Sequence, residues 1–225
     1  MSLEKLLKDE DLEFMQDQEK FLAKKWRVVE KEFLSFVDTA DMDKFLENSF
    51  GNCIDGELYE RPIYSMFLRE WWISMFSYCL WDNESSRLVR GHSDQVVSVA
   101  AGGGFIEWHL RETGVDVVAT DIKEYGYWDN GFIDIEVLDA VNAVKKYSDR
   151  DVLLSWPEYR ESIAYDVAIN MSSGRKLYYI GERPGGCCAD GEFFDYLEES
   201  FEFIRGHVIP TWCGIYDALW ILRKK

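Results

Sequence analysis

The stretch VVSVAAGGGFIEWHLRETGVDVVATD, residues 96–121, decides the fold expected for this chain. A short β-branched run precedes three consecutive glycines, a helical segment at 105–113, a closing Gly114 and a second apolar run at 115–122. Glycine commonly ends helices, and small residues between a strand and a helix let a ligand approach the backbone closely. The stretch therefore predicts a strand–turn–helix–strand unit with a ligand-binding turn.

The segments that follow continue this alternation. We expect further strands at 133–138, 152–156 and 176–181, and helices at 140–147, 161–171 and 192–205. Two last apolar runs, 207–213 and 216–223, join at Gly214 and predict an antiparallel hairpin. Strands that alternate with helices are typical of a parallel sheet covered on both faces. Residues 91–225 are therefore predicted to form an α/β, Rossmann-like domain with seven mostly parallel strands.

The first 90 residues predict a separate helical extension. Apolar residues recur there every three to four positions between blocks of charge, which favours two or three helices. The aromatic segment 62–81 predicts a buried helix, because Arg69 and Glu70 in its middle oppose a membrane span. We expect the polar run 82–86 to end this helix. We interpret the extension as a packing cap, with a lid that grips substrate as the alternative.

Composition narrows the class of partner. The 225 residues carry a net charge of −17, from 25 basic and 42 acidic side chains. Such a chain repels phosphate backbones, so a small molecule or a protein is favoured as partner over nucleic acid, which is not excluded. Five cysteines without a C-x-x-C and without a secretory signal favour a cytoplasmic location. The three histidines and the cysteines are scattered, and no metal site is expected.

The glycine turn contains the candidate cofactor residues. The small residues Ala100, Ala101, Gly102 and Gly104 leave room for a ligand, but position 107 is Glu, so a true G-x-G-x-x-G is absent. Asp121 ends the second strand, 19 residues after Gly102, where its carboxylate can accept hydrogen bonds from both hydroxyls of a ribose or cap a helix. Asp139 follows the third strand and is a candidate for an adenine amino group or for a helix N-cap.

The order of these features resembles the class I S-adenosylmethionine-dependent methyltransferases, over residues 96–225. Within that superfamily the chain is most similar to an uncharacterised methyltransferase-like group. The turn at 100–104 matches the family's first motif, Asp121 its ribose acid, Leu138-Asp139-Ala140 its adenine-side motif, and the closing hairpin its last two strands. The resemblance implies S-adenosylmethionine as cofactor. The implied cofactor residues are Ala100, Ala101, Gly102, Gly104, Asp121, Ile122, Asp139, Ala140 and Ser155.

The segment LLSWPEY, residues 153–159, lies at the family's fourth motif. It resembles the (Asp/Asn)-Pro-Pro-(Tyr/Phe) of amino-group methyltransferases, with Trp156 at the acid position and Glu158 at the second proline, while Pro157 and Tyr159 are retained. These four residues are candidate catalytic residues. Glu182, after the fifth strand, is a further candidate base, and its alternative is a salt bridge with Arg183 or Arg175.

The predicted function is methyl transfer from S-adenosylmethionine to an unknown acceptor, with a small molecule or an amino group favoured. In-line methyl transfer needs positioning and desolvation more than strong acids or bases, so the lack of a triad is no obstacle. Two departures, Ser98 for the usual strand acid and Ala100 for the first glycine, together with Glu158, favour the alternative of a catalytically eroded binding or scaffold protein. A nicotinamide-dependent oxidoreductase is the further alternative, opposed by Glu107 and the hairpin.

Overall fold

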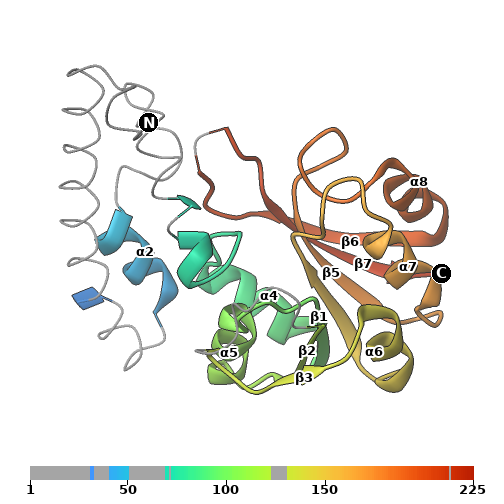
Figure 1. Cartoon of the computed structure of the whole chain (residues 1–225), viewed down its shortest axis with the longest axis horizontal. Coiled ribbons are helices and arrows are strands. Elements are labelled where there is room, and N and C mark those ends of the chain that lie inside the picture. Colours follow the sequence, from blue (N-terminus) through green and yellow to red (C-terminus); the bar gives the residue numbers. More distant parts are fainter. Residues whose placement is uncertain (1–30, 33–40, 51–68, 71, 123–130, 213) are drawn as a thin grey trace, which may run out of the picture.

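The computed structural model describes residues 31–32, 41–50, 69–70, 72–122, 131–212 and 214–225. One sheet of seven strands lies between two layers of helices (Figure 1). The strands are β1 Gln95–Val99, β2 Asp116–Asp121, β3 Ile135–Val137, β4 Asp151–Ser155, β5 Lys176–Gly181, β6 Phe201–Val208 and β7 Ala218–Lys224. The helices are α2 Met42–Phe50, α4 Asn83–His92, α5 Phe105–Glu112, α6 Ala140–Lys146, α7 Ile163–Asn170 and α8 Gly191–Ser200.

The strand order is β3-β2-β1-β4-β5-β7-β6. Strands β1 to β5 pair in parallel, while β7 is antiparallel to both β5 and β6. The predicted Rossmann-like sheet of seven strands with a closing antiparallel hairpin is confirmed. Because β7 runs against its neighbours, its first residue lies at the edge where the parallel strands end, beside Gly181.

Alternating side chains of the strands bury two cores, one on each face of the sheet. One core joins the sheet to α4, α5 and the aromatic segment before them, with Trp72, Trp81 and Phe105 fully buried. The other joins it to α6, α7 and α8, with Tyr179 and Phe193 at its centre. Strand β1 shows the division, since Val96 packs in the first core and Val97 in the second.

The segment before β1 differs from the expectation. The expected helix at 62–81 is helical at 69–70 and 72–75, whereas 76–81 form bends; residues 62–68 and 71 lie outside the described part. The polar run after it begins helix α4 instead of ending a helix. Asp82 caps that helix, because its carboxylate accepts the N–H of Ser85 at 2.8 Å. The sequence-based reading of this run as a breaker was wrong, since capping residues and turn residues are the same types.

The boundary between the last helix and the hairpin also differs. Helix α8 ends at Ser200, and the following residues up to Val208 form β6, where the sequence predicted helix to residue 205. Strand β6 lies at the edge of the sheet and its register shifts between Phe203 and Arg205. This irregularity disturbs the alternation of apolar and polar residues by which a strand is recognised, and Phe203 is 60% exposed.

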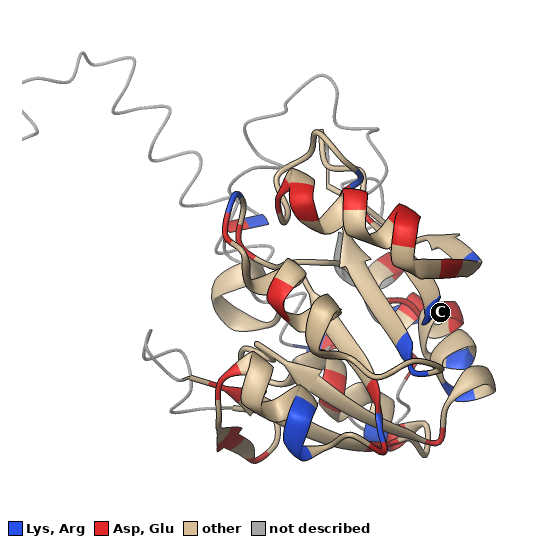
Figure 2. Ribbon diagram, turned by 90° about the vertical axis from the view of Figure 1, so that its right-hand side faces the viewer, with Lys and Arg blue, Asp and Glu red and all other residues tan. Residues whose placement is uncertain are grey.

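The expected N-terminal helices lie mostly outside the described residues, so the division at residue 90 stays a prediction. Among the described residues no helix is long and apolar enough to cross a membrane. The same residues contain no group of three or more His, Cys, Asp or Glu side chains able to hold a metal ion. Exposed acidic residues lie along helix α8 (Figure 2): Glu192, Asp195, Glu198 and Glu199.

Candidate cofactor and acceptor site

The turn between β1 and α5 takes the shape that its small residues permit. Ala100, Gly102 and Gly104 all have positive φ, at 52°, 63° and 75°. The N–H of Ala101 donates to the carbonyl of Thr120 at 3.0 Å, and this bond fastens the turn to the end of β2. Left-handed backbone suits glycine, so Ala100 occupies a position that its Cβ disfavours.

The glycines of the turn meet different surroundings. A Cβ at Gly104 would lie 2.7 Å from Cγ1 of Ile133, so this residue is closed in by protein. A Cβ at Gly103 would meet no atom of the described residues within 4 Å. Protein side chains therefore pack against the turn at Gly104, whereas the described residues leave space at Gly103 where a ligand can approach the backbone.

Asp121 lies beside this turn, at the carboxyl end of β2. Its Oδ2 accepts the N–H of Gly102 at 3.1 Å, and the side chain is largely buried. The next residue, Ile122, is 48% exposed and offers apolar surface next to the carboxylate. The structure thus brings together the glycine turn, an acid and an apolar side chain, as a bound nucleoside requires.

Glu107 explains one departure from the family pattern. It lies on the first turn of α5, is buried, and accepts a hydrogen bond at Oε1 from the hydroxyl of Ser98 at 2.5 Å. Burial raises the pKa of Glu107 to about 7, an effect that the bond from Ser98 opposes. A carboxyl group therefore does lie at the end of β1, supplied by the helix instead of the strand.

Asp139 acts as the cap of α6. Its Oδ1 accepts the N–H of Asn142 at 3.0 Å and its Oδ2 accepts the side-chain amide of the same residue at 2.5 Å. These bonds hold the pKa of Asp139 below its usual range. The N-cap interpretation is confirmed, and the adenine-side role of Asp139 and its buried neighbour Ala140 stays a prediction.

Trp156 follows β4 in a strained backbone conformation, with a φ of 50°. Positive φ is a genuine outlier for a bulky residue, whereas Asn and Asp adopt it more readily. The amino-group methyltransferase motif has Asn or Asp at this position. The backbone N–H of Trp156 still donates to the carbonyl of Ile180 at 2.8 Å, so the strain does not come from a lost strand bond.

The ring of Trp156 connects the fourth motif to the segment before α4. It stacks on Tyr78 with centroids 5.5 Å apart and planes at 21°, and the Arg69 guanidinium lies 5.1 Å from its centroid. The Cys79 sulfur lies 3.9 Å from the hydroxyl of Ser155. Arg69, Tyr78 and Cys79 therefore lie over the end of β4, which sequence spacing alone does not reveal.

Of the remaining residues of the fourth motif, one is buried and two are exposed. Pro157 is buried and its carbonyl accepts the N–H of Ala189 at 3.2 Å, but Glu158 is exposed. Tyr159 is 51% exposed, with the Arg160 guanidinium 4.8 Å from its ring centre. A catalytic role for Glu158 or Tyr159 stays a prediction.

Glu182 is buried and bound by backbone. Its Oε2 accepts the N–H of Cys187 at 2.7 Å and its Oε1 the N–H of Tyr216 at 3.1 Å. The suggested salt bridge with Arg175 is wrong, because that guanidinium donates to the carbonyls of Val144, Tyr147 and Arg150. Glu182 fastens the loop after β5 to the residues before β7.

The sequence analysis missed Asp217, which directly precedes β7 and is 1% exposed. Burial raises its pKa to about 7, hydrogen bonding by the Trp156 indole N–H opposes this rise, and the Glu182 carboxylate adds to it. Nothing near residue 217 in the sequence marks it. Only the antiparallel course of β7 brings it to the carboxyl edge of the parallel strands.

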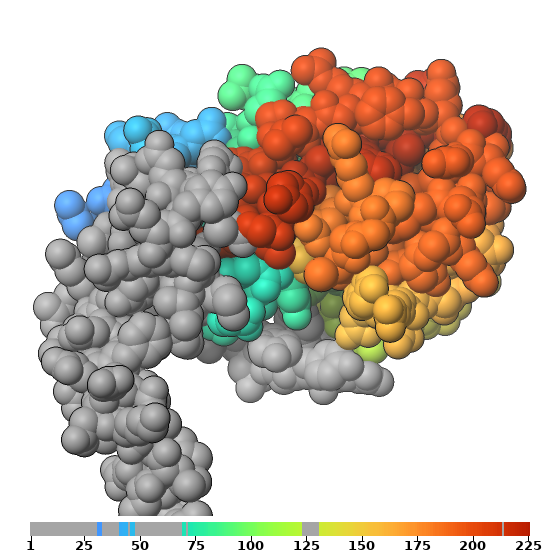
Figure 3. All heavy atoms as spheres, turned by 90° about the horizontal axis from the view of Figure 1, so that it is seen from above, coloured from blue at the N-terminus to red at the C-terminus, as the bar shows by residue number. Residues whose placement is uncertain are grey.

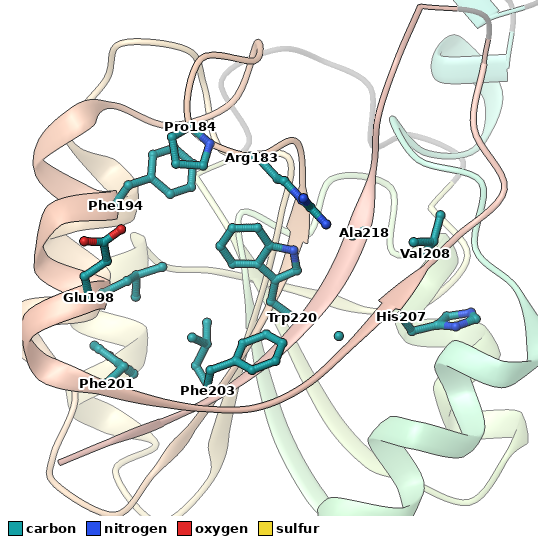
Figure 4. Close-up of a pocket in the computed structure, with 13 residues that line it drawn as sticks. Arg183, Pro184, Phe194, Glu198, Phe201, Phe203, His207, Val208, Ala218 and Trp220 are labelled. Carbon is teal, nitrogen blue, oxygen red and sulfur yellow. The ribbon is translucent and has the colours of Figure 1, made fainter.

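A separate cavity of about 780 Å³ lies between α8 and the β6–β7 hairpin (Figure 4). Trp220 stands in its middle, between Arg183 and Phe194. The hairpin and α8, orange to red, form much of the face in Figure 3. None of the candidate cofactor or catalytic residues lines this cavity, so it is not the site assembled around the glycine turn.

The strand order, the closing hairpin and the glycine turn beside Asp121 together decide the architecture. The fold is that of the class I methyltransferases. No protein-family model matches the sequence, and no curated protein matches it.

Several solved structures are similar to this chain. A TehB-like SAM-dependent methyltransferase from Corynebacterium glutamicum is 18% identical, with 73% of this chain and 100% of that chain covered and a TM-score of 0.46. The 1,6-didemethyltoxoflavin-N1-methyltransferase of Burkholderia thailandensis, solved with bound 1,6-didemethyltoxoflavin and S-adenosylhomocysteine, is 14% identical, with 75% of this chain and 90% of that chain covered and a TM-score of 0.43. An rRNA methylase from Streptococcus thermophilus is 17% identical over 63% and 94%, with a TM-score of 0.42.

Proposed function

We propose that this chain is an S-adenosylmethionine-dependent methyltransferase whose acceptor is a small molecule or an amino group. The observation that carries the proposal is the bond from the Gly102 N–H to the Asp121 carboxylate, which fixes an acid beside a glycine turn at the carboxyl edge of a parallel sheet. Ligands of such sheets bind at this edge. Asp121 would accept hydrogen bonds from the ribose, and Ile122 would pack on the adenine.

The residues present fit this cofactor. Gly103 has open space where a side chain would otherwise stand, and the exposed face of Ile122 lies next to the acid. When bound, S-adenosylmethionine supplies an electrophilic methyl group. The task of the protein is then to orient the acceptor and exclude water, for which the covered end of β4 is suited.

Substitution of Asp121 tests the proposal. Asp121→Ala removes the ribose contact and should weaken S-adenosylhomocysteine binding by about a hundredfold, since two charge-assisted hydrogen bonds are lost. Calorimetry measures the affinity, and Asp149→Ala, which removes an exposed acid after α6, is the matched control. Unchanged affinity in Asp121→Ala would remove this residue from the site. Binding of NAD in place of S-adenosylhomocysteine would favour the oxidoreductase alternative.

A second candidate is a binding protein with this fold and no transfer activity. The strained Ala100 and the exposed Glu158 favour it. Ser98 no longer does, because Glu107 brings a carboxyl group to it. Transfer of a labelled methyl group to any member of a panel of amines would exclude this candidate, whereas cofactor binding without transfer would support it.

A further inference from the structure

Asp217 is a buried acid whose hydrogen-bonding capacity is left largely unused by the residues that the structure describes. Its side chain is 1% exposed, and neither carboxylate oxygen receives a hydrogen bond of normal geometry from any residue that the structure describes. Buried polar groups in native proteins nearly always have partners, and a buried carboxylate without one lowers stability. The exception calls for a partner other than the residues that the structure describes, and a bound ligand is one such partner.

Two buried donors next to Asp217 are also without a bond of normal geometry among the described residues. They are the indole Nε1 of Trp156 and the Nε of Arg69. Both groups act on the carboxyl of Asp217. The Trp156 indole N–H lowers its pKa through a hydrogen-bonding contact that falls short of normal hydrogen-bond geometry, and the Arg69 guanidinium lowers it through its charge. Donors and an acceptor that do not fully satisfy one another therefore converge at the end of β4, from three segments far apart in the sequence.

The charges and strain of this cluster indicate what it binds. The neighbouring carboxylate, Glu182, accepts a backbone N–H at each oxygen and is thereby held in place as part of the loop structure. Asp217 accepts no such backbone bond from the described residues and keeps more of its acceptor capacity for a ligand. Trp156 is held there at a positive φ, and backbone strain of this kind concentrates at functional sites.

We propose that Asp217 binds and orients the acceptor, and that this acceptor is a primary or secondary amine whose N–H donates to the Asp217 carboxylate. The inference rests on the proposed function. In the transfer, the nitrogen lone pair forms the N–C bond while the C–S bond breaks and its electron pair returns to sulfur, leaving a neutral thioether. The proton released from nitrogen passes to a carboxylate oxygen of Asp217.

This assignment differs from what the fourth motif alone suggests. Glu158, the acid within that motif, is exposed, and Glu182 is occupied. Asp217 directly precedes β7. Strands β4 and β7 both pair with β5, so Asp217 lies at the same edge of the sheet as Ser155 and Trp156 at the end of β4. The acid that faces the acceptor thus comes from the hairpin and not from the motif.

Calorimetry with benzylamine as the probe tests the inference, with and without saturating S-adenosylhomocysteine. The wild-type protein should bind benzylamine more tightly than benzyl alcohol, which has the same ring and no N–H. Asp217→Asn should weaken benzylamine binding by about tenfold or more and leave S-adenosylhomocysteine binding unchanged. Asp195→Asn, which removes an exposed acid from α8, is the control and should bind both ligands as the wild type does.

The melting temperature supplies a second measurement. Asparagine has nearly the same shape and removes an unpaired buried charge, so Asp217→Asn should melt at or above the wild-type temperature. A lower melting temperature would show that Asp217 supports the fold and would overturn the inference. So would equal benzylamine affinity in the variant, or no binding by the wild type at millimolar amine. Failure of the wild type to bind S-adenosylhomocysteine would instead reject the proposed function, and the inference with it.

Discussion

The glycine turn and the acceptor edge, by which we mean the cluster of Arg69, Trp156 and Asp217, lie at the same edge of one sheet. They differ in how far apart in the sequence their residues are. The turn is assembled by neighbours in sequence, with Gly102 bonded to Asp121 nineteen positions on. The acceptor edge combines Arg69, Trp156 and Asp217, which are far apart in the chain. Each contains a buried acid whose pKa burial raises to about 7, Glu107 in one and Asp217 in the other.

The difference between the two acids is in their partners. Glu107 receives a bond from Ser98, so half of its carboxyl group is satisfied by the protein, while its Oε2 has no partner among the described residues. Neither oxygen of Asp217 has a partner at normal hydrogen-bond geometry among the described residues. The comparison teaches that two buried acids with the same raised pKa can differ in how far the surrounding protein satisfies them, and only the less satisfied one is proposed to meet a ligand.

The largest expected effect belongs to Glu107→Gln. The native pKa of about 7 lies above the ordinary 4.5, so the native state holds the proton more tightly than the unfolded state. The associated stability is complete below pH 4.5 and is lost as the pH rises to 7. Glutamine does not titrate, so above pH 7 the variant should be more stable by about 3 kcal/mol at most, from the 1.36 kcal/mol that one pKa unit represents.

Urea unfolding between pH 4 and 8 measures this effect as the difference in free energy of unfolding. The groups near Glu107 are Ser98, Arg111 and Asp121. Glu112→Gln, an exposed acid on the same helix, is the control and should show no such pH dependence. A constant difference across this range would contradict the buried, protonated state of Glu107.

Gly104→Ala should have the next largest effect. It introduces a Cβ at a φ of 75° and within 2.7 Å of Ile133, so we expect a loss of about 2 kcal/mol from backbone strain and overpacking. Gly103→Ala is the matched control, because its Cβ meets nothing within 4 Å. Thermal unfolding compares the two, and equal melting temperatures would show that the turn is not packed as described.

Ala100→Gly should have a smaller effect, and of opposite sign. Relief of the left-handed alanine, at a φ of 52°, should stabilise the protein by about 1 kcal/mol. Ala101→Gly, one position along and without positive φ, should instead destabilise it, since glycine gains only chain entropy in the unfolded state. The same sign for both variants, measured by chemical unfolding, would reject the strain at Ala100.

The two regions also differ in how far the sequence predicts them. Glycines, Asp121 and the alternation of apolar runs follow from local physics, so β1, β2, β5 and the sheet class were predicted within a residue or two. Helix α4 was not predicted, because an aspartate such as Asp82 is equally common at a helix N-cap and in a turn that ends a helix. The start of β6 was not predicted, because its register shift disturbs the alternation of apolar and polar residues. Asp217 could not be found, since its role depends on tertiary contacts with Trp156 and Arg69.

The antiparallel direction of β7 has a consequence for how such a protein can diversify. Every parallel strand contributes its last residues to the functional edge, whereas β7 contributes its first, and the chain reaches it through the connection from β6. The bonds of the glycine turn are made by residues 101–121 and by Phe132, none of which belongs to that connection. With Asp217 in its proposed role, substitutions in the connection would change the acceptor side of the site and leave the bonds of the glycine turn in place.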